Sequence, residues 1–153
     1  MDPICVAECV VECTLICYSA GKALNGLRDQ FTHVPQKVAT LVAETKVVGG
    51  ALAQIQNAIL QRDDHPGMWS PSSGLAQKLA IVLEAGAIVF RCLEKDIRRI
   101  TSGITALDKP LWEDRAHEVW SSDQLNAYLD DLKGCSRRLA HCYRFCKRTM
   151  LES

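Results

Sequence analysis

The beginning of the chain restricts its fold most strongly, because residues 4–20 (ICVAECVVECTLICYSA) are apolar on almost every side. The only charged residues in this stretch are Glu8 and Glu12, and the first basic residue of the chain is Lys22. At about 100° per residue, the two glutamates share one narrow face of a helix. A helix of this composition either packs into a protein core or enters a bilayer.

The energetics of insertion favour the core for this stretch at rest. As a helix it is about 26 Å long, slightly shorter than a hydrocarbon core of about 30 Å. Its strongly apolar residues favour insertion by roughly 2–4 kcal/mol in total, whereas two central carboxylates oppose it by roughly 5–7 kcal/mol. These apolar residues are Ile4, Val6, Val10, Val11, Leu15 and Ile16. We therefore expect a buried resting helix with a solvated glutamate face; insertion would require the glutamates to be protonated or to face other helices or water.

Composition and charge narrow the class of protein. The chain has 153 residues, of which 48% are apolar and 24% charged, as in ordinary globular domains. Its zero net charge gives no bulk field that would attract nucleic acid. Eight cysteines follow no basic, cleavable leader, and cysteines four apart on one helix have diverging Cβ vectors that disfavour disulfides. We expect free thiols and a reducing, cytoplasmic location.

The rest of the chain has helical periodicity with no competing strand pattern. We expect residues 22–31 to continue the first helix, followed by helices at about 35–60, 75–104, 110–119 and 122–150. Residues 61–74 form a loop rich in turn-forming residues, and Ser121 with Gln124 forms a capping box. The prediction is one all-α domain spanning 1–153. It is a bundle of four long helices and one short connecting helix, with the apolar N-terminal helix at its centre.

The N-terminal sequence resembles that of a known family. Met1-Asp2-Pro3, then Ile4, Val6, Ala7 and Val10, and an apolar run into Ala20-Gly21-Lys22 are similar to the start of fungal HeLo-like domains. These are the N-terminal domains of fungal STAND, or NOD-like, receptors. The resemblance continues through the remaining helices and covers essentially the whole chain.

The resemblance implies a signalling and effector domain at the start of a longer protein. Such domains self-associate, act with the C-terminal receptor domains of the same chain, and execute programmed cell death or heterokaryon incompatibility at membranes. It implies Glu8 and Glu12 as pore or cation-binding candidates, and Ile4, Val6, Val10, Val11, Leu15 and Ile16 as the lipid-facing set. It also implies a cytoplasmic protein that associates with the plasma membrane on activation. Separately, the basic residues Arg91, Lys95, Arg98 and Arg99 in the 75–104 helix form either a solvated face or a surface for anionic lipid headgroups or an acidic partner.

Two other interpretations of the sequence remain open. Cysteines on the first and last helices can face each other across a bundle and bind Cu(I), a soft metal that thiolates select; equally, cysteine is a small residue that packs well in a core. The candidate thiols are Cys5, Cys9, Cys13, Cys17, Cys135, Cys142 and Cys146, with Cys92 nearby. Alternatively, the bundle is a scaffold that binds partner helices or itself and never contacts lipid.

An enzyme is the interpretation with least support. The four histidines are scattered, without a spacing that joins them to a nucleophile or a metal; they are His33, His65, His117 and His141. The chain has no P-loop, dinucleotide fingerprint or HExxH motif. We therefore predict no catalytic activity and no cofactor.

Overall fold

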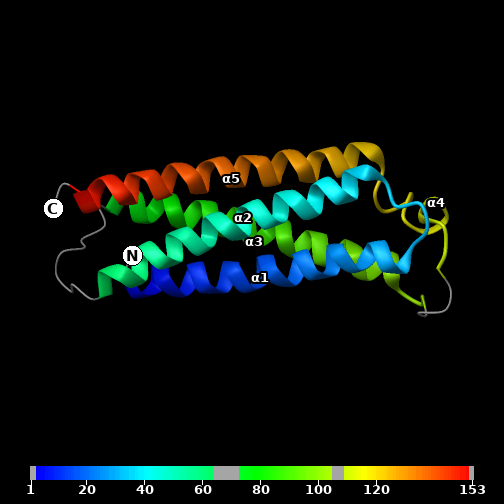
Figure 1. Ribbon diagram of the computed structural model, residues 1–153, viewed down its shortest axis with the longest axis horizontal. Helices are drawn as coiled ribbons and strands as arrows, with labels where there is room; N and C mark the ends of the chain where they lie inside the picture. Colours follow the sequence, from blue (N-terminus) through cyan, green and yellow to red (C-terminus); the bar gives the residue numbers. More distant parts are fainter. Residues whose placement is uncertain (1–2, 64–72, 105–108, 152–153) are drawn as a thin grey trace.

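The computed structural model confirms an all-α bundle of four long helices and one short one (Figure 1). It describes residues 3–63, 73–104 and 109–151, so most of the predicted 61–74 loop lies outside the described residues. The long helices are α1 (Pro3–Gln30), α2 (Gln36–Asp63), α3 (Ser73–Thr101) and α5 (Ser122–Leu151), and the short one is α4 (Trp112–Arg115).

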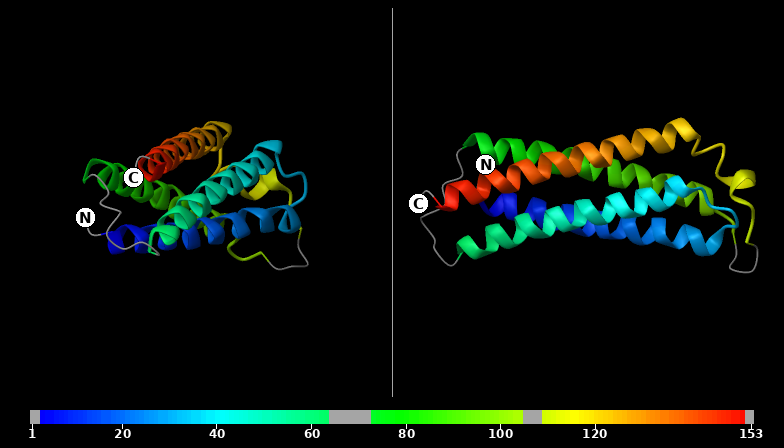
Figure 2. Two further views of the ribbon diagram at one scale, coloured as in Figure 1. Left: turned by 60° about the vertical axis from the view of Figure 1, so that its left-hand side comes forward. Right: turned by 45° about the horizontal axis from the view of Figure 1, so that its top comes forward.

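The long helices lie side by side, with α4 across one end of the bundle (Figure 2). Helix α1 packs against α2 and α3, and α5 packs against the same two helices, so α1 and α5 occupy opposite corners. Neighbours α1 and α3 run parallel, as do α2 and α5 (Figure 1). The N-terminal helix, predicted to be central, thus lies at one corner of the bundle. One side of it is buried in the core and the opposite side is exposed to solvent.

The core follows the apolar seams that the sequence predicts. Each long helix contributes side chains spaced three and four residues apart, as expected for an amphipathic helix. Fully buried members include Leu24 and Leu27 on α1, Leu41 and Ile55 on α2, Phe90 and Leu93 on α3, and Leu132 and Leu139 on α5. Thr45 is the buried polar residue among the described side chains, and its hydroxyl donates to the carbonyl of Leu41 at 2.8 Å.

Local signals place the helix ends where expected, except in the connector. Pro35 disfavours helix at the residue before it, and α2 begins directly after it. The amide of Gln124 donates to Ser121 Oγ at 3.2 Å, which confirms the predicted cap of α5. The connecting helix was predicted to span 110–119, but α4 covers only Trp112–Arg115. The chain then turns, with the amide of Trp120 bonded to the carbonyl of Ala116 at 2.7 Å.

Two glycines allow close approach between helices. A Cβ at Gly21 of α1 would lie 3.2 Å from Thr45 Cγ2 of α2, and one at Gly86 of α3 would lie 3.1 Å from Cys135 Sγ of α5. Both distances are shorter than ordinary contact, so a side chain would push the helices apart. Helix α1 is continuous through Gly21, and the missing side chain at this position allows the close contact with Thr45 of α2.

Candidate functional site

The inner face of α1 forms a continuous buried stripe along the bundle, which we call the inner stripe. Seven side chains repeat at alternating steps of four and three residues, and each is at most 3% exposed. They are Val6, Val10, Cys13, Cys17, Ala20, Leu24 and Leu27. This heptad-like spacing keeps one narrow stripe of the helix against its neighbours. The buried stripe explains why an apolar helix can rest in the bundle with its glutamates outside.

The opposite side of α1 carries apolar residues in solvent, which we call the outer stripe: Val11, Leu15 and Tyr18. Their exposed fractions are 42%, 65% and 72%. The spacing of four and three residues places them on one face of the helix. The predicted lipid-facing set is thus divided at rest, with Val11 and Leu15 exposed, Ile16 half-buried, and Val6 and Val10 in the core. The side chain of Ile4 lies outside the described ones.

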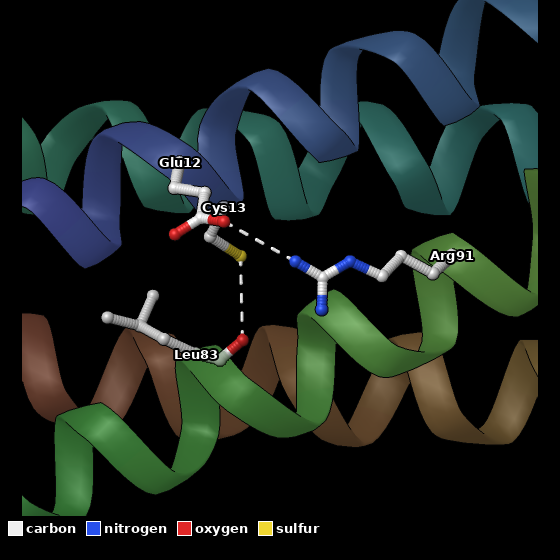
Figure 3. A network of polar contacts seen from close by, with 4 residues as sticks. All are labelled: Glu12, Cys13, Leu83 and Arg91. Carbon is white, nitrogen blue, oxygen red and sulfur yellow. Dashed lines mark hydrogen bonds and ion pairs between the residues drawn. The ribbon is translucent and has the colours of Figure 1, made fainter.

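Both glutamates of α1 are exposed, as predicted, and one of them has a partner that the sequence did not indicate. Glu12 Oε1 lies 3.4 Å from Nη2 of Arg91 on α3, and Figure 3 shows the guanidinium reaching toward it. The two side chains are 67% and 59% exposed. Exposed pairs of this kind contribute little, about 0–1 kcal/mol. The pair therefore adds little to the free energy that holds α1 against α3.

Thiols from α1 and α5 meet in the core near the middle of the bundle. Cys13 Sγ donates to the carbonyl of Leu83 at 3.7 Å (Figure 3), and Cys17 Sγ donates to the carbonyl of Thr45 at 3.5 Å. Burial raises the pKa of Cys13 and that of Cys17 to about 12, reinforced by Cys135 beside Cys13 and by Cys13 beside Cys17. These groups are protonated at neutral pH, so they are poor nucleophiles and poor metal ligands.

The copper interpretation gains no support from the described side chains. No three His, Cys, Asp or Glu residues among them are placed to hold a metal ion. Cys142 and Cys146 are buried on α5, Cys9 is half-buried, and Cys92 is exposed instead of joining the others. The side chain of Cys5 lies outside the described ones.

The difference in exposure predicts a difference in thiol reactivity. At pH 8, Cys92 should react with a disulfide reagent within the mixing time, whereas Cys13, Cys17 and Cys135 should react only as the fold opens, because they are buried and protonated. Stopped-flow absorbance records the Cys92 reaction as a burst amplitude and the buried thiols as a slow phase, and Cys92→Ser should lower that burst by one thiol. Rapid modification of Cys13 in the native protein, detected by peptide mass mapping, would contradict this prediction.

The C-terminal end of α1 is fastened by backbone hydrogen bonds. Thr32 forms a parallel β-bridge with Leu111, just before α4. The Thr32 amide donates to the carbonyl of Pro110, and the Trp112 amide donates to the carbonyl of Thr32, both at 3.0 Å. Thr32 Oγ1 also donates to the carbonyl of Lys109 at 3.2 Å. This end of α1 cannot leave the bundle without breaking directional bonds.

An aromatic row continues from that fastening into the core. Ring centroids are 5.4 Å apart for Phe31 and Trp112, 5.9 Å for Trp112 and Trp120, and 6.0 Å for Trp120 and Tyr128. Asp96 Oδ2 on α3 accepts hydrogen bonds from Trp120 Nε1 at 3.0 Å and from the Tyr128 hydroxyl at 2.6 Å. Burial, followed by this bond to Asp96, raises the pKa of Tyr128.

The first half of α1 is attached differently. Among the described side chains, its polar contacts with other helices are the two thiol bonds and the exposed Glu12–Arg91 pair. The remaining attachment is apolar packing of the inner stripe. Helix α1 is therefore fastened at its C-terminal end by directional bonds and held along its N-terminal half mainly by contacts that another apolar environment could replace.

Grooves flank α1 on both sides. One groove of about 460 Å³ lies between α1 and α2 and includes Tyr18, Lys22 and Lys46 in its lining. Another of about 230 Å³ lies between α1 and α3 and includes the Glu12–Arg91 pair. Sequence reasoning missed both grooves, because each is made by two helices whose pairing the apolar pattern does not specify.

A segment of membrane length occurs on α2, which packs beside α1 in the bundle. Within the described part of the chain, Gln36–Ile59 of α2 is long and apolar enough to cross a bilayer, judged by length and composition alone. Only 39% of its most apolar window is buried in the bundle.

No protein-family model, curated protein or solved structure matches this chain.

Proposed function

We propose that this chain is a HeLo-like effector domain of the kind that begins fungal NOD-like receptors, and that it acts at membranes through the N-terminal half of α1. The observation that carries the proposal is the unequal attachment of α1 together with the exposed outer stripe. The outer stripe makes first contact with lipid or with a second copy. The fastened end at Thr32 remains in place while the N-terminal half of α1 separates from α2 and α3.

The energetics are consistent with such a release. Exposing Val6 and Val10 to water would cost about 3–6 kcal/mol together, which keeps the helix in the bundle at rest. A bilayer buries the same side chains again, so their part of the cost is recovered on insertion. A further obstacle is Glu8 and Glu12, which self-association removes when glutamates from several copies face a shared aqueous interior. The output is membrane permeabilisation in programmed cell death.

Leakage of a dye from liposomes tests this function. The full chain should release dye from vesicles that contain anionic lipid, and deletion of residues 2–20 should abolish release. Because that deletion also removes part of the core, Leu15→Asp is the sharper variant: Leu15 is 65% exposed, so the fold should be retained. It should lower leakage by about tenfold or more, because a carboxylate on the lipid-facing side opposes insertion by about 2.5–3.5 kcal/mol.

Ile88→Asp is the matched control, since Ile88 lies on α3 and is 53% exposed. It should leak like the unmodified chain. Full leakage by the chain lacking residues 2–20, or equal loss in both Asp variants with unchanged circular dichroism, would refute the proposal.

A scaffold without membrane activity is the second candidate, and the outer stripe also favours it. Exposed apolar residues at helical spacing are typical of a surface that a partner helix covers. This function predicts self-association that Leu15→Asp removes, measured by sedimentation, and no dye release by the unmodified chain.

A further inference from the structure

The groove between α1 and α2 has the dimensions of a small-molecule site. Its volume is about 460 Å³, within the range of about 300–1,000 Å³ that is usual for ligand pockets. Its lining comes from α1 around Cys17 and Gly21 and from α2 around Thr45 and Gly49. It follows the line where α1 and α2 approach closely, at the contact between Gly21 and Thr45.

The floor of this groove presents little hydrogen-bonding capacity. The Thr14 hydroxyl donates to the carbonyl of Val10 at 2.7 Å, and the Thr45 hydroxyl donates to that of Leu41. The Cys17 thiol donates to the carbonyl of Thr45. Since these hydrogens are already bonded to backbone carbonyls, the floor offers methyl groups, glycine backbone and sulfur to an occupant, while the polar groups of Tyr18 and Asn25 belong to the exposed part of the lining. Such a surface suits an aliphatic chain.

The rim of the groove is positively charged. Lys22 enters the lining from α1 and Lys46 from α2, both exposed, and no acidic residue is part of the lining. Neither ammonium is within ion-pair distance of a carboxylate in the described part of the chain. Two cations on opposite walls leave a positive potential where the groove meets solvent, which attracts an anion.

We propose that this groove binds the anion of a long-chain fatty acid. The aliphatic tail lies along the apolar floor between α1 and α2, and the carboxylate accepts hydrogen bonds from Lys22 and Lys46 at the rim. A neutral lipid would leave both cations unpaired, and a polar peptide would lose its own hydrogen bonds on the floor. The site does not depend on membrane activity, so it is tested by binding alone.

The probe is a fluorescent polyene fatty acid, titrated into the full chain below its micelle-forming concentration. We expect saturable binding with one probe per chain. Myristate should displace the probe, whereas 1-tetradecanol, with the same chain length but no charge, should need a concentration at least about tenfold higher. Equal displacement by the alcohol would overturn the role of the two lysines.

Two pairs of variants locate the site. Lys22→Glu with Lys46→Glu should weaken binding by about tenfold or more, whereas Lys133→Glu on α5 should not. Gly49→Leu fills the groove, since a Cβ there points at Cys17 Sγ at 3.7 Å, whereas Gly50→Leu points into open space and controls for helix propensity. Gly49→Leu should abolish binding, whereas Gly50→Leu should retain it. Thermal melts show whether each variant folds.

Binding that survives the lysine double variant overturns the site, and so does binding that survives a folded Gly49→Leu protein. A third adverse outcome is absence of probe binding together with a dimer that Gly49→Leu dissociates. In that case a second copy of the chain, and not a fatty acid, occupies the groove.

Discussion

Replacing Leu24 with alanine is expected to lower the free energy of unfolding by about 2–5 kcal/mol. Leu24 belongs to the inner stripe of α1 and is fully buried in the core. The substitution removes apolar contact and leaves a cavity that rigid neighbouring helices fill only partly. Urea unfolding followed by circular dichroism measures the loss as a lower midpoint with an unchanged slope.

The same substitution at Leu15 provides the control on the same helix. Leu15 is 65% exposed, so Leu15→Ala should change the free energy of unfolding by no more than about 0.5 kcal/mol. Leu15→Ala should nevertheless reduce lipid association if the outer stripe contacts membranes. A loss of stability at Leu15 comparable to that at Leu24 would show that α1 is turned differently about its axis.

Replacing Asp96 with alanine is the second change with a large expected effect. Its carboxylate accepts hydrogen bonds from Trp120 Nε1 and the Tyr128 hydroxyl, and both of those side chains are buried. Alanine leaves two buried donors without their acceptor, at about 1–3 kcal/mol each, so the loss should be about 2–6 kcal/mol. Urea unfolding measures it.

Asp96→Asn separates the hydrogen bonds from the charge. The amide oxygen can still accept from both donors, so this variant should lose less than half as much stability as Asp96→Ala. The Tyr128 phenol gives an independent readout by ultraviolet absorbance. In Asp96→Ala its pKa should fall but stay above the ordinary value, because burial is the larger cause of its elevation. Equal unfolding midpoints for the two variants would contradict this account of Asp96.

The helices and their buried faces could be predicted from sequence because each rests on a local pattern. The helical periodicity of residues 75–104 and 122–150 predicts one apolar face on each helix, and Leu79, Leu93 and Leu139 on those faces are each at most 1% exposed. Ser121 three residues before Gln124 predicted the start of α5, since a side-chain oxygen there meets an amide without a partner. Such signals need only the neighbouring residues.

The features that depend on helix pairing could not be predicted in the same way. The spacing of apolar residues shows which face of α1 is buried, but it does not show that α3 is the neighbouring helix. Sequence analysis therefore missed the Glu12–Arg91 pair and both grooves. The connector was predicted too long because no glycine or proline interrupts residues 112–119. The packing of Trp112 on Trp120 and the bond from Trp120 to Asp96 favour turns there instead.

The parallel pairing of α1 with α3 and of α2 with α5 has a consequence for how the chain folds. In each pair the helices are separated in sequence by a whole intervening helix, so neither contact can form within a simple helical hairpin. The Thr32–Leu111 bridge closes a loop of similar length. Because loop closure costs entropy before such contacts form, the chain should fold more slowly than a bundle built only from sequential hairpins. During synthesis, α1 emerges well before α3, so its apolar surface stays without that neighbour until more than a hundred residues exist.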